Sequence, residues 1–230
     1  MTRGLGLSAL GVLAIAGGAR LLAAQQVPPS AVRPPASTLS RPSTPASSPS
    51  AAGFLRRWLL LEPIKASGQL TDSAVRATVD KDYFPNQLTV LPHDGDKVMV
   101  GDEPLVWHAV DTTNYNVNLY HFGYALNKPT SNVLFWAVTQ VDAPQEMRDV
   151  RLAIGSNAAS IWWLNGHEVI DLFNDRQTVI DDGVSKRVIL KKGLNTVRVA
   201  VINAGGATDF CARFLDAGDH PIKGISLRLP

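Results

Sequence analysis

Three aromatic and three polar residues carry the chemistry that this sequence offers most clearly. Aromatic rings stack on the apolar C–H patches of sugars, and polar side chains bind the surrounding hydroxyl groups. The polar members lie in a stretch of Asn, Asp and Arg that is typical of a loop, where binding residues concentrate. The candidate carbohydrate-binding residues are Tyr115, Tyr120, Trp162, Asn174, Arg176 and Asp181.

Each candidate also has a structural interpretation. An ion pair between Arg176 and a loop acid, Asp181 for example, is favoured over a ligand contact. Three tryptophans inside apolar runs are expected to be buried, namely Trp107, Trp136 and Trp163. Because successive side chains of a strand point to opposite faces, Trp162 is expected to be partly exposed.

The sequence contains no recognisable catalytic motif. There is no Gly-x-Ser-x-Gly nucleophile motif, and the five His show no His-x-x-x-His ligand spacing. The adjacent acids Asp181 and Asp182 precede a Gly, which is typical of a solvated turn. Two catalytic carboxylates need a defined gap across a sugar, which a sequence alone does not show. We therefore expect no enzyme activity and no catalytic residue.

One acidic loop has the composition of a cation site. His93, Asp94 and Asp96 cluster around Gly95, and hard cations prefer such clustered oxygen ligands. The loop supplies too few ligands for a full coordination shell, and Asp-Gly sequences form turns by themselves. We therefore favour a turn and expect no metal ligand and no cofactor.

Strands are the elements that must position these residues. Short runs of Val, Ile, Leu and aromatic residues alternate with Gly, Asn, Asp and Pro, which indicates β-strands. Residues 70–79 are the best candidate for one short helix. About eleven strands without an internal repeat predict an all-β, antiparallel β-sandwich. The strand runs are 58–64, 105–110, 118–126, 132–141, 149–154, 160–164, 168–173, 184–190, 195–203, 209–215 and 225–229.

A hairpin at the centre of the chain is the clearest of these elements. Residues 160–164 form its first strand and residues 168–173 the returning strand. Asn165 and Gly166 lie between them, and a type I′ turn needs positive φ at both central residues.

Four landmarks in order resemble a known family. They are the opening strand Trp58 to Ile64, Gly95-Asp96 followed by Trp107, the hairpin from Gly155-Ser156 to Gly166, and Arg176 followed by residues 190–199 and the closing stretch from Phe210 to Gly218. Together they resemble the galactose-binding-like jelly roll across residues 54–230. Such domains are similar to the sugar-binding domain of β-galactosidase-type glycoside hydrolases and to accessory domains of acetylxylan-esterase-type proteins.

The resemblance implies a non-catalytic carbohydrate-binding module that contacts plant or microbial polysaccharide. It also allows a structural Ca²⁺ held partly through backbone oxygens. The chain departs from the family where Asn157-Ala158-Ala159 replaces the usual Asp-Asp-Gly, and where Glu62 replaces a Gly. Two alternatives stay open: a structural or protein-interaction domain of the cell envelope, and more remotely a carbohydrate esterase or glycoside hydrolase. A partner enzyme or an envelope protein is the corresponding protein partner.

The N-terminal residues predict export. Residues 1–24 read as a signal peptide, because Arg3 precedes an uncharged apolar run from Leu5 to Ala19 that is short for a membrane span. An uncleaved membrane anchor is the alternative. Residues 25–53 contain seven Pro and seven Ser, so we expect a disordered linker there. The folded domain is then 54–230, and the expected location is secreted or periplasmic.

Charge and cysteine content exclude other classes. The four Arg before residue 54 account for the basic excess; without them, 18 basic residues face 20 acidic ones, a net charge of −2. The folded part therefore lacks the basic footprint of nucleic-acid binding. Cys211 is the single cysteine of the sequence, so no internal disulfide is available. We expect it to be a small packed residue.

Overall fold

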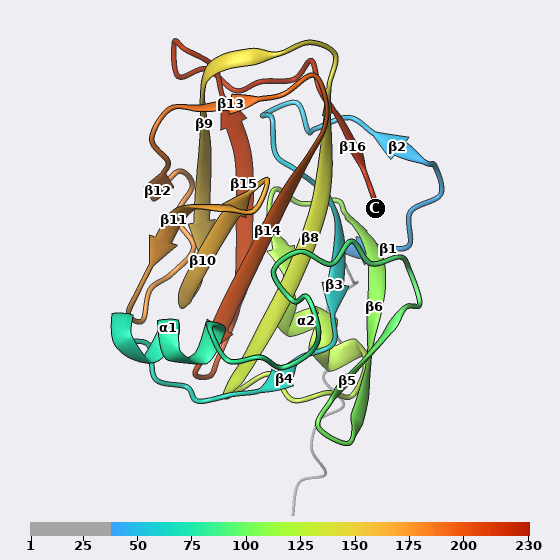
Figure 1. The fold of residues 1–230 in the computed structure, drawn as a ribbon, viewed down its shortest axis with the longest axis vertical. Helices are drawn as coiled ribbons and strands as arrows, with labels where there is room; N and C mark the ends of the chain where they lie inside the picture. Colours follow the sequence, from blue (N-terminus) through green and yellow to red (C-terminus); the bar gives the residue numbers. More distant parts are fainter. Residues whose placement is uncertain (1–37) are drawn as a thin grey trace, which may run out of the picture. The chain divides into compact units, whose positions relative to one another are not determined.

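The computed structural model describes residues 38–230, and these fold mainly into β-strands (Figure 1). Every strand pairing within this range is antiparallel, and two sheets are formed. The antiparallel β-sandwich expected from the alternating apolar runs is confirmed. No helix among these residues is long and apolar enough to cross a membrane. The predicted signal peptide lies outside the described residues, as does the linker as far as residue 37.

The larger sheet is built around two long central strands, β8 (Val133–Ala143) and β14 (Gly193–Asn203), paired along their whole length. In the described residues the sheet has eleven strands and a main path β1-β6-β3-β8-β14-β10-β11. The other strands of the path are β1 (Leu39–Ser40), β6 (Glu103–Thr112), β3 (Arg57–Leu61), β10 (Ala159–Leu164) and β11 (His167–Leu172). Four short strands join its sides: β2 (Ala46–Ser47), β4 (Ile64–Lys65), β5 (Lys97–Val100) and β16 (Ser226–Arg228).

The smaller sheet packs against one face of the larger sheet. Its described strands number five: β7 (Val117–Asn118), β9 (Met147–Ser156), β12 (Gly183–Val184), β13 (Val188–Leu190) and β15 (Asp209–Leu215). Strands β9 and β15 pair over six residues and form its centre. The apolar run 184–190, expected as one strand, is split into β12 and β13, each of which pairs with β9.

Of the two helices in the described residues, one was predicted from the sequence and the other was predicted to be a strand. Helix α1 (Asp72–Val79) lies within the run 70–79 expected to be helical. The run 118–126, expected to be a strand, forms β7 and then helix α2 (Leu119–Ala125). Asn118 caps α2 by accepting a hydrogen bond from the backbone N–H of His121 at 2.7 Å. Leu119 and Phe122, one helical turn apart, are both buried, which is helical spacing rather than strand alternation.

The ordered domain begins earlier than residue 54. Residues 39–40 pair with β6, and residues 46–47 pair with β16. Buried Arg57 helps to hold these residues on the sheet. Its guanidinium donates to the carboxylate of Asp111 at 2.7 and 2.8 Å, and to the carbonyl of Thr44 at 2.7 Å. Residues 38–53 are thus part of the sandwich edge and not the disordered linker expected there.

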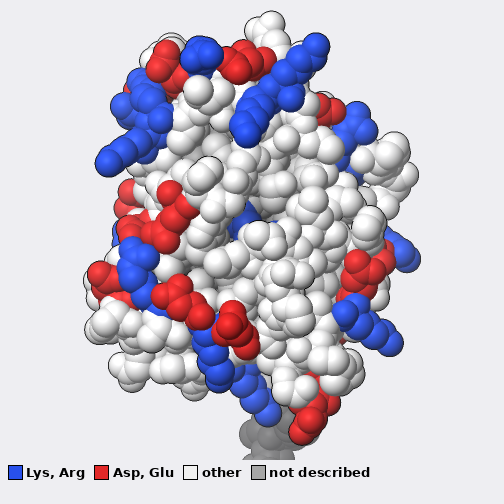
Figure 2. All heavy atoms as spheres, in the orientation of Figure 1, with Lys and Arg blue, Asp and Glu red and all other residues white. Residues whose placement is uncertain are grey.

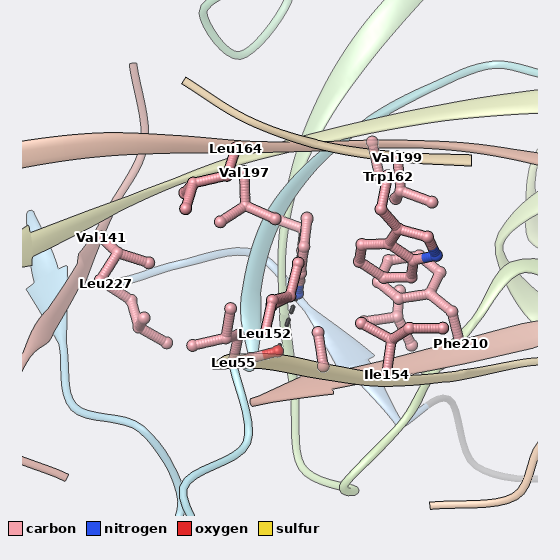
Figure 3. Packing of buried hydrophobic residues seen from close by; sticks show 14 of the residues in the cluster. Leu55, Val141, Leu152, Ile154, Trp162, Leu164, Val197, Val199, Phe210 and Leu227 are labelled. Carbon is pink, nitrogen blue, oxygen red and sulfur yellow. Dashed lines mark hydrogen bonds between the residues drawn. The ribbon is translucent and has the colours of Figure 1, made fainter. Parts of the chain in front are cut away.

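Two apolar clusters pack on opposite faces of the larger sheet. One lies between the sheets, where Trp162 of β10 points toward Phe210 and Ile154 of the facing sheet (Figure 3). The other lies on the outer face, where α1 and the segment 80–92 cover Trp107, Trp136 and neighbouring residues. The larger sheet is therefore buried on both faces along much of its length, as its nearly uninterrupted apolar strands require.

Candidate functional site

Trp162 is not a surface residue. Its side chain is fully buried, its indole N–H donates to the hydroxyl of Ser160 at 2.9 Å, and its ring meets Trp58 and Phe210 edge-on. Strand alternation does place Trp162 and Trp163 on opposite faces. Because both faces of the sheet are covered at this point, neither ring is exposed as a sugar platform, and the expected exposure of Trp162 is wrong.

Tyr115 and Asp181 are linked near the outer face of the smaller sheet. The link runs through Phe54 and Arg213. The Tyr115 ring packs on Phe54 with centroids 5.6 Å apart, and the Arg213 guanidinium lies over the same Phe54 ring at 5.1 Å. Arg213 in turn donates to both carboxylate oxygens of Asp181, from Nε at 2.9 Å and from Nη2. Burial, aided by the negative charge of Asp209, raises the pKa of Tyr115. The Asp181 carboxylate therefore already has a protein partner.

Arg176 forms the structural ion pair that was expected, with Asp182 in place of Asp181. Its Nη1 also donates to the carbonyl of Phe173, at 3.4 Å, and its Nε is buried without a hydrogen-bond partner among the described residues. Asn174 is exposed, has φ of 70°, and donates its backbone N–H to Leu70. The segment 174–182 is held against the smaller sheet by two other contacts, Thr178 with Asp209 and Asp181 with Arg213, both on β15.

Gly155 and Cys211 form the surface on which that segment rests. A Cβ on Gly155 would lie 2.1 Å from the carbonyl oxygen of Val179 and 3.1 Å from Sγ of Cys211. Cys211 is buried, as its expected role as a small packed residue requires, and burial raises the pKa of its thiol to about 12. The thiol is therefore protonated at neutral pH, which leaves it a poor nucleophile.

A cleft that the sequence did not reveal lies between β1, β6 and α2. Its volume is about 440 Å³. Seven apolar residues form its walls: Leu39, Val106, Ala109, Val110, Phe122, Ala125 and Leu126. Arg41, Asp94, His108 and His121 supply its polar groups. An apolar hollow with a few convergent polar groups is the usual form of a small-molecule or oligosaccharide site.

Asp94 is fixed at the edge of this cleft. Its carboxylate accepts hydrogen bonds from the backbone N–H of Ala109 at 2.8 Å and from the guanidinium of exposed Arg41 at 2.5 Å. Although partial burial acts to raise it, these two donors hold the pKa of Asp94 below its ordinary value. The acid-rich loop around it is a turn, as favoured from the sequence: Asp96 accepts from the backbone N–H of His93 at 2.7 Å.

The two histidines of the cleft differ in their partners. His108 Nε2 lies 3.2 Å from a carboxylate oxygen of Glu62, whose other oxygen lies 3.2 Å from Lys128. A hydrogen bond to Glu103 chiefly raises the pKa of Lys128. His121 Nδ1 is buried and has no hydrogen-bond partner within residues 38–230. A buried polar atom without a partner is costly, so this atom calls for an explanation.

Tyr120 and Tyr124 project from the same helix that forms one wall of the cleft. They are 36% and 52% exposed, and their rings are nearly parallel, with centroids 6.2 Å apart. The Tyr120 ring also contacts His121 edge-on, at 6.1 Å. Helix α2 thus places two exposed aromatic faces beside a histidine of the cleft. Of the residues predicted to bind sugar, Tyr120 alone adjoins this site.

The spacing of the cleft residues in the sequence does not predict that they lie together. His108 lies on β6 and His121 on α2, with β7 between them, and Arg41 comes from the segment expected to be a linker. The two elements adjoin only because the chain turns back on itself. Among the described residues there is no group of three or more His, Cys, Asp or Glu that could hold a metal ion.

Comparisons with known proteins show likeness to several sandwich domains and no family assignment. No protein-family model matches the sequence, and no curated protein matches it. Among solved structures, a β-glucosidase from Kluyveromyces marxianus is 22% identical, with a TM-score of 0.41, over 79% of this chain and 20% of its own. The chain therefore spans about a fifth of that enzyme.

Two smaller solved domains are matched over nearly their whole length. The PA14 sugar-binding domain of an RTX adhesin is 11% identical, with a TM-score of 0.44, over 74% of this chain and 96% of its own. The A domain of a subtype-switched epithelial adhesin 9 from Candida glabrata, solved with β-lactose, is 12% identical, with a TM-score of 0.41, over 82% of this chain and 94% of its own. Scores this low assign neither family nor function, so the β-sandwich rests on the strand pairing of the chain itself.

Proposed function

We propose that this chain is a secreted or periplasmic, non-catalytic carbohydrate-binding module whose site is the cleft beside α2. The observation that carries the proposal is the combination of an apolar cleft with two exposed tyrosines on the helix that forms its wall. Sugars present both apolar C–H patches and hydroxyl groups, so they need this mixture of surfaces. Plant or microbial polysaccharide is the proposed ligand class, as the galactose-binding-like resemblance implies.

The polar groups of the cleft suit hydroxyl recognition. His121 Nδ1 lacks a partner, and the Asp94 carboxylate is held in its charged form, so it can accept from a hydroxyl. Exposed Arg41 adds donors at the mouth of the cleft. Tyr120 and Tyr124 offer ring faces to the next sugar unit along a chain.

Two features of the cleft favour binding over catalysis. A glycosidase needs a carboxylic acid with a raised pKa as its proton donor, whereas the pKa of Asp94 is lowered. Ser40 also lines the cleft, but no hydrogen bond joins its hydroxyl to His108 or His121 in the described part of the chain. The contact between nucleophile and base that defines an esterase is therefore missing from this arrangement.

The test is a binding panel with the whole chain. Purified protein is titrated with soluble plant and microbial polysaccharides by affinity electrophoresis and calorimetry. The double variant Tyr120→Ala, Tyr124→Ala is expected to bind about tenfold more weakly, a loss of ~1.4 kcal/mol that matches the removal of aromatic stacking. His121→Ala should weaken binding as well.

Tyr115→Ala is the matched control, because Tyr115 is a similarly exposed tyrosine on a different surface. Its affinity should equal that of the unchanged chain. A loss confined to Tyr115→Ala would move the site to the smaller sheet and overturn the assignment to α2. Failure of the unchanged chain to bind any polysaccharide of the panel would overturn the proposed function itself.

A further inference from the structure

A second hollow lies on the outer face of the larger sheet, between the segment 85–91 and the turn from β10 to β11. Its volume is about 340 Å³. We call it the leucine groove, formed by Leu88, Leu91 and Leu194 as walls, Trp163 and Arg198 as floor, and Lys191 at the rim. It shares no lining residue with the cleft beside α2.

The walls of the groove are unusually apolar for a surface. Leu88, Leu91 and Leu194 are 42%, 46% and 52% exposed, and they are the only exposed leucines in the described residues. All three meet at one hollow although Leu194 lies about a hundred residues from the others in the sequence. Figure 2 shows a broad, largely uncharged area on this face, with a recessed Lys or Arg group near its middle and most charged side chains at its margins. Clustered exposed apolar side chains mark interaction surfaces.

Arg198 gives the floor of the groove an uncompensated positive charge. Its side chain is 2% exposed and donates to the backbone carbonyls of Gln87, at 3.0 Å, and Val90. Within residues 38–230 it has no carboxylate partner. Burial lowers its pKa to about 10, so the guanidinium is still charged near neutral pH. A buried charge without a counter-charge is unfavourable, and an acidic ligand in the groove would offset that cost.

The rim of the groove is also positively charged. Lys191 and Lys192 are exposed in the turn before β14, and neither ammonium group has an ion-pair partner in the described part of the chain. The nearby Asp142 is already paired with Arg228, at 3.0 Å. The groove is therefore apolar along its walls and basic at its floor and rim.

We propose that the leucine groove binds an acidic, apolar peptide segment of a partner protein. Apolar side chains of the segment pack against Leu88 and Leu194, and its carboxylates lie near Lys191 and the positive floor. The aliphatic walls favour a peptide over an acidic polysaccharide, because sugars are held on aromatic faces. The complementary charges select acidic segments and reject basic ones.

The test uses the whole chain and two synthetic, fluorescein-labelled peptides. One repeats Glu-Leu-Glu-Ile-Glu-Leu, and the other replaces each Glu by Lys. Fluorescence anisotropy should show binding of the acidic peptide, weakened by salt, and binding of the basic peptide at least about tenfold weaker. Polygalacturonate serves as an acidic polysaccharide competitor.

Two variants with matched controls locate the binding. Leu194→Ser and Lys191→Glu should each weaken the acidic peptide several-fold. Ile189→Ser and Lys223→Glu make the same kinds of change at exposed positions outside the groove and should have no effect. The tyrosine double variant of α2 should also bind the peptide normally, so this proposal and the proposed function fail separately.

Three results would overturn the inference. They are equal binding of the acidic and basic peptides, unchanged binding by Leu194→Ser and Lys191→Glu, and binding of polygalacturonate but not of the acidic peptide with the same dependence on Lys191. The last result would make the groove a site for acidic sugars. Arg198 itself is left unchanged in the test, because it also holds the segment 85–91 on the sheet.

Discussion

At the scale of single residues, the neighbouring Trp162 and Trp163 show how far strand alternation can be taken. Alternation gives the direction of each side chain, and both directions are as the sequence predicts. It does not say what covers a face. Trp162 meets Phe210 of the facing sheet, whereas Trp163 stacks near Trp136 under the outer covering. Whether a side chain is exposed depends on what packs against that face of the sheet, and the alternation pattern does not give this.

Gly155 carries the sharpest residue-scale prediction. Gly155→Ala places a Cβ where the Val179 carbonyl lies, so either β9 or the segment 174–182 must move. Overpacking of this kind destabilises by about 1–3 kcal/mol. Urea unfolding should show a lower midpoint with an unchanged slope.

Gly224→Ala is the control for this substitution. A Cβ on Gly224 meets nothing within 4 Å, so that variant should unfold like the unchanged chain. If Gly155→Ala unfolds at the same midpoint as Gly224→Ala, the close approach of Val179 to β9 is not present in solution.

At the scale of elements, the segment 38–53 is the clearest difference from expectation. Its Pro and Ser content resembles a linker, yet β1 and β2 occupy edge positions in the larger sheet. Pro is tolerated at sheet edges because no ladder N–H is needed on the outer side. Besides these pairings, Arg57 of β3 holds the segment, because its guanidinium donates to the carbonyl of Thr44.

Replacing Arg57 tests that attachment. Arg57→Gln removes the bidentate contact with Asp111 and the bond to Thr44, and leaves polar groups without partners. Loss of one member of a buried pair costs about 3–5 kcal/mol, and the lower end applies because Asp111 is 29% exposed. Hydrogen exchange should show faster exchange at residues 39–47, together with a lower unfolding midpoint.

Arg56→Gln is the neighbouring control. Arg56 is partly exposed and forms no ion pair in the described residues, so a change within about 0.5 kcal/mol is expected. Equal protection of residues 39–47 in both variants would show that β1 and β2 do not depend on Arg57.

At the scale of the whole molecule, the larger sheet joins two apolar clusters. Strands β8 and β14 contribute alternate residues to both clusters. We therefore expect that neither cluster unfolds while the other stays packed on the sheet. The five tryptophans divide between them: Trp58 and Trp162 lie in the inner cluster, and Trp107, Trp136 and Trp163 lie in the outer one.

Unfolding should therefore be a single cooperative step. Tryptophan fluorescence and far-ultraviolet circular dichroism are expected to give coincident urea transitions. Trp58→Phe and Trp107→Phe, which each remove a reporter from one cluster, should keep the two probes coincident. Separate fluorescence midpoints in these variants would mean that the outer cluster melts independently.

The sequence by itself determined the local elements. Asn165-Gly166 fixed the turn of the hairpin, with φ of 51° and 83°, because a two-residue hairpin loop needs left-handed backbone. The alternation of Val197, Val199 and Val201 predicts a strand with the three valines on one face, and in β14 that face is the inner one. These are short-range properties, since turn geometry and side-chain alternation depend mainly on neighbouring residues.

Only the tertiary structure decided where the two candidate sites lie. The cleft needs β6, α2 and a strand from the apparent linker, and the leucine groove needs Leu88 beside Leu194. Trp162, a sugar-binding candidate by sequence, was buried by the opposite sheet, whereas His121 gained a place that its sequence neighbours did not predict. Sites of this kind form where distant segments meet, and a sequence pattern reports periodicity along the chain but not proximity across it.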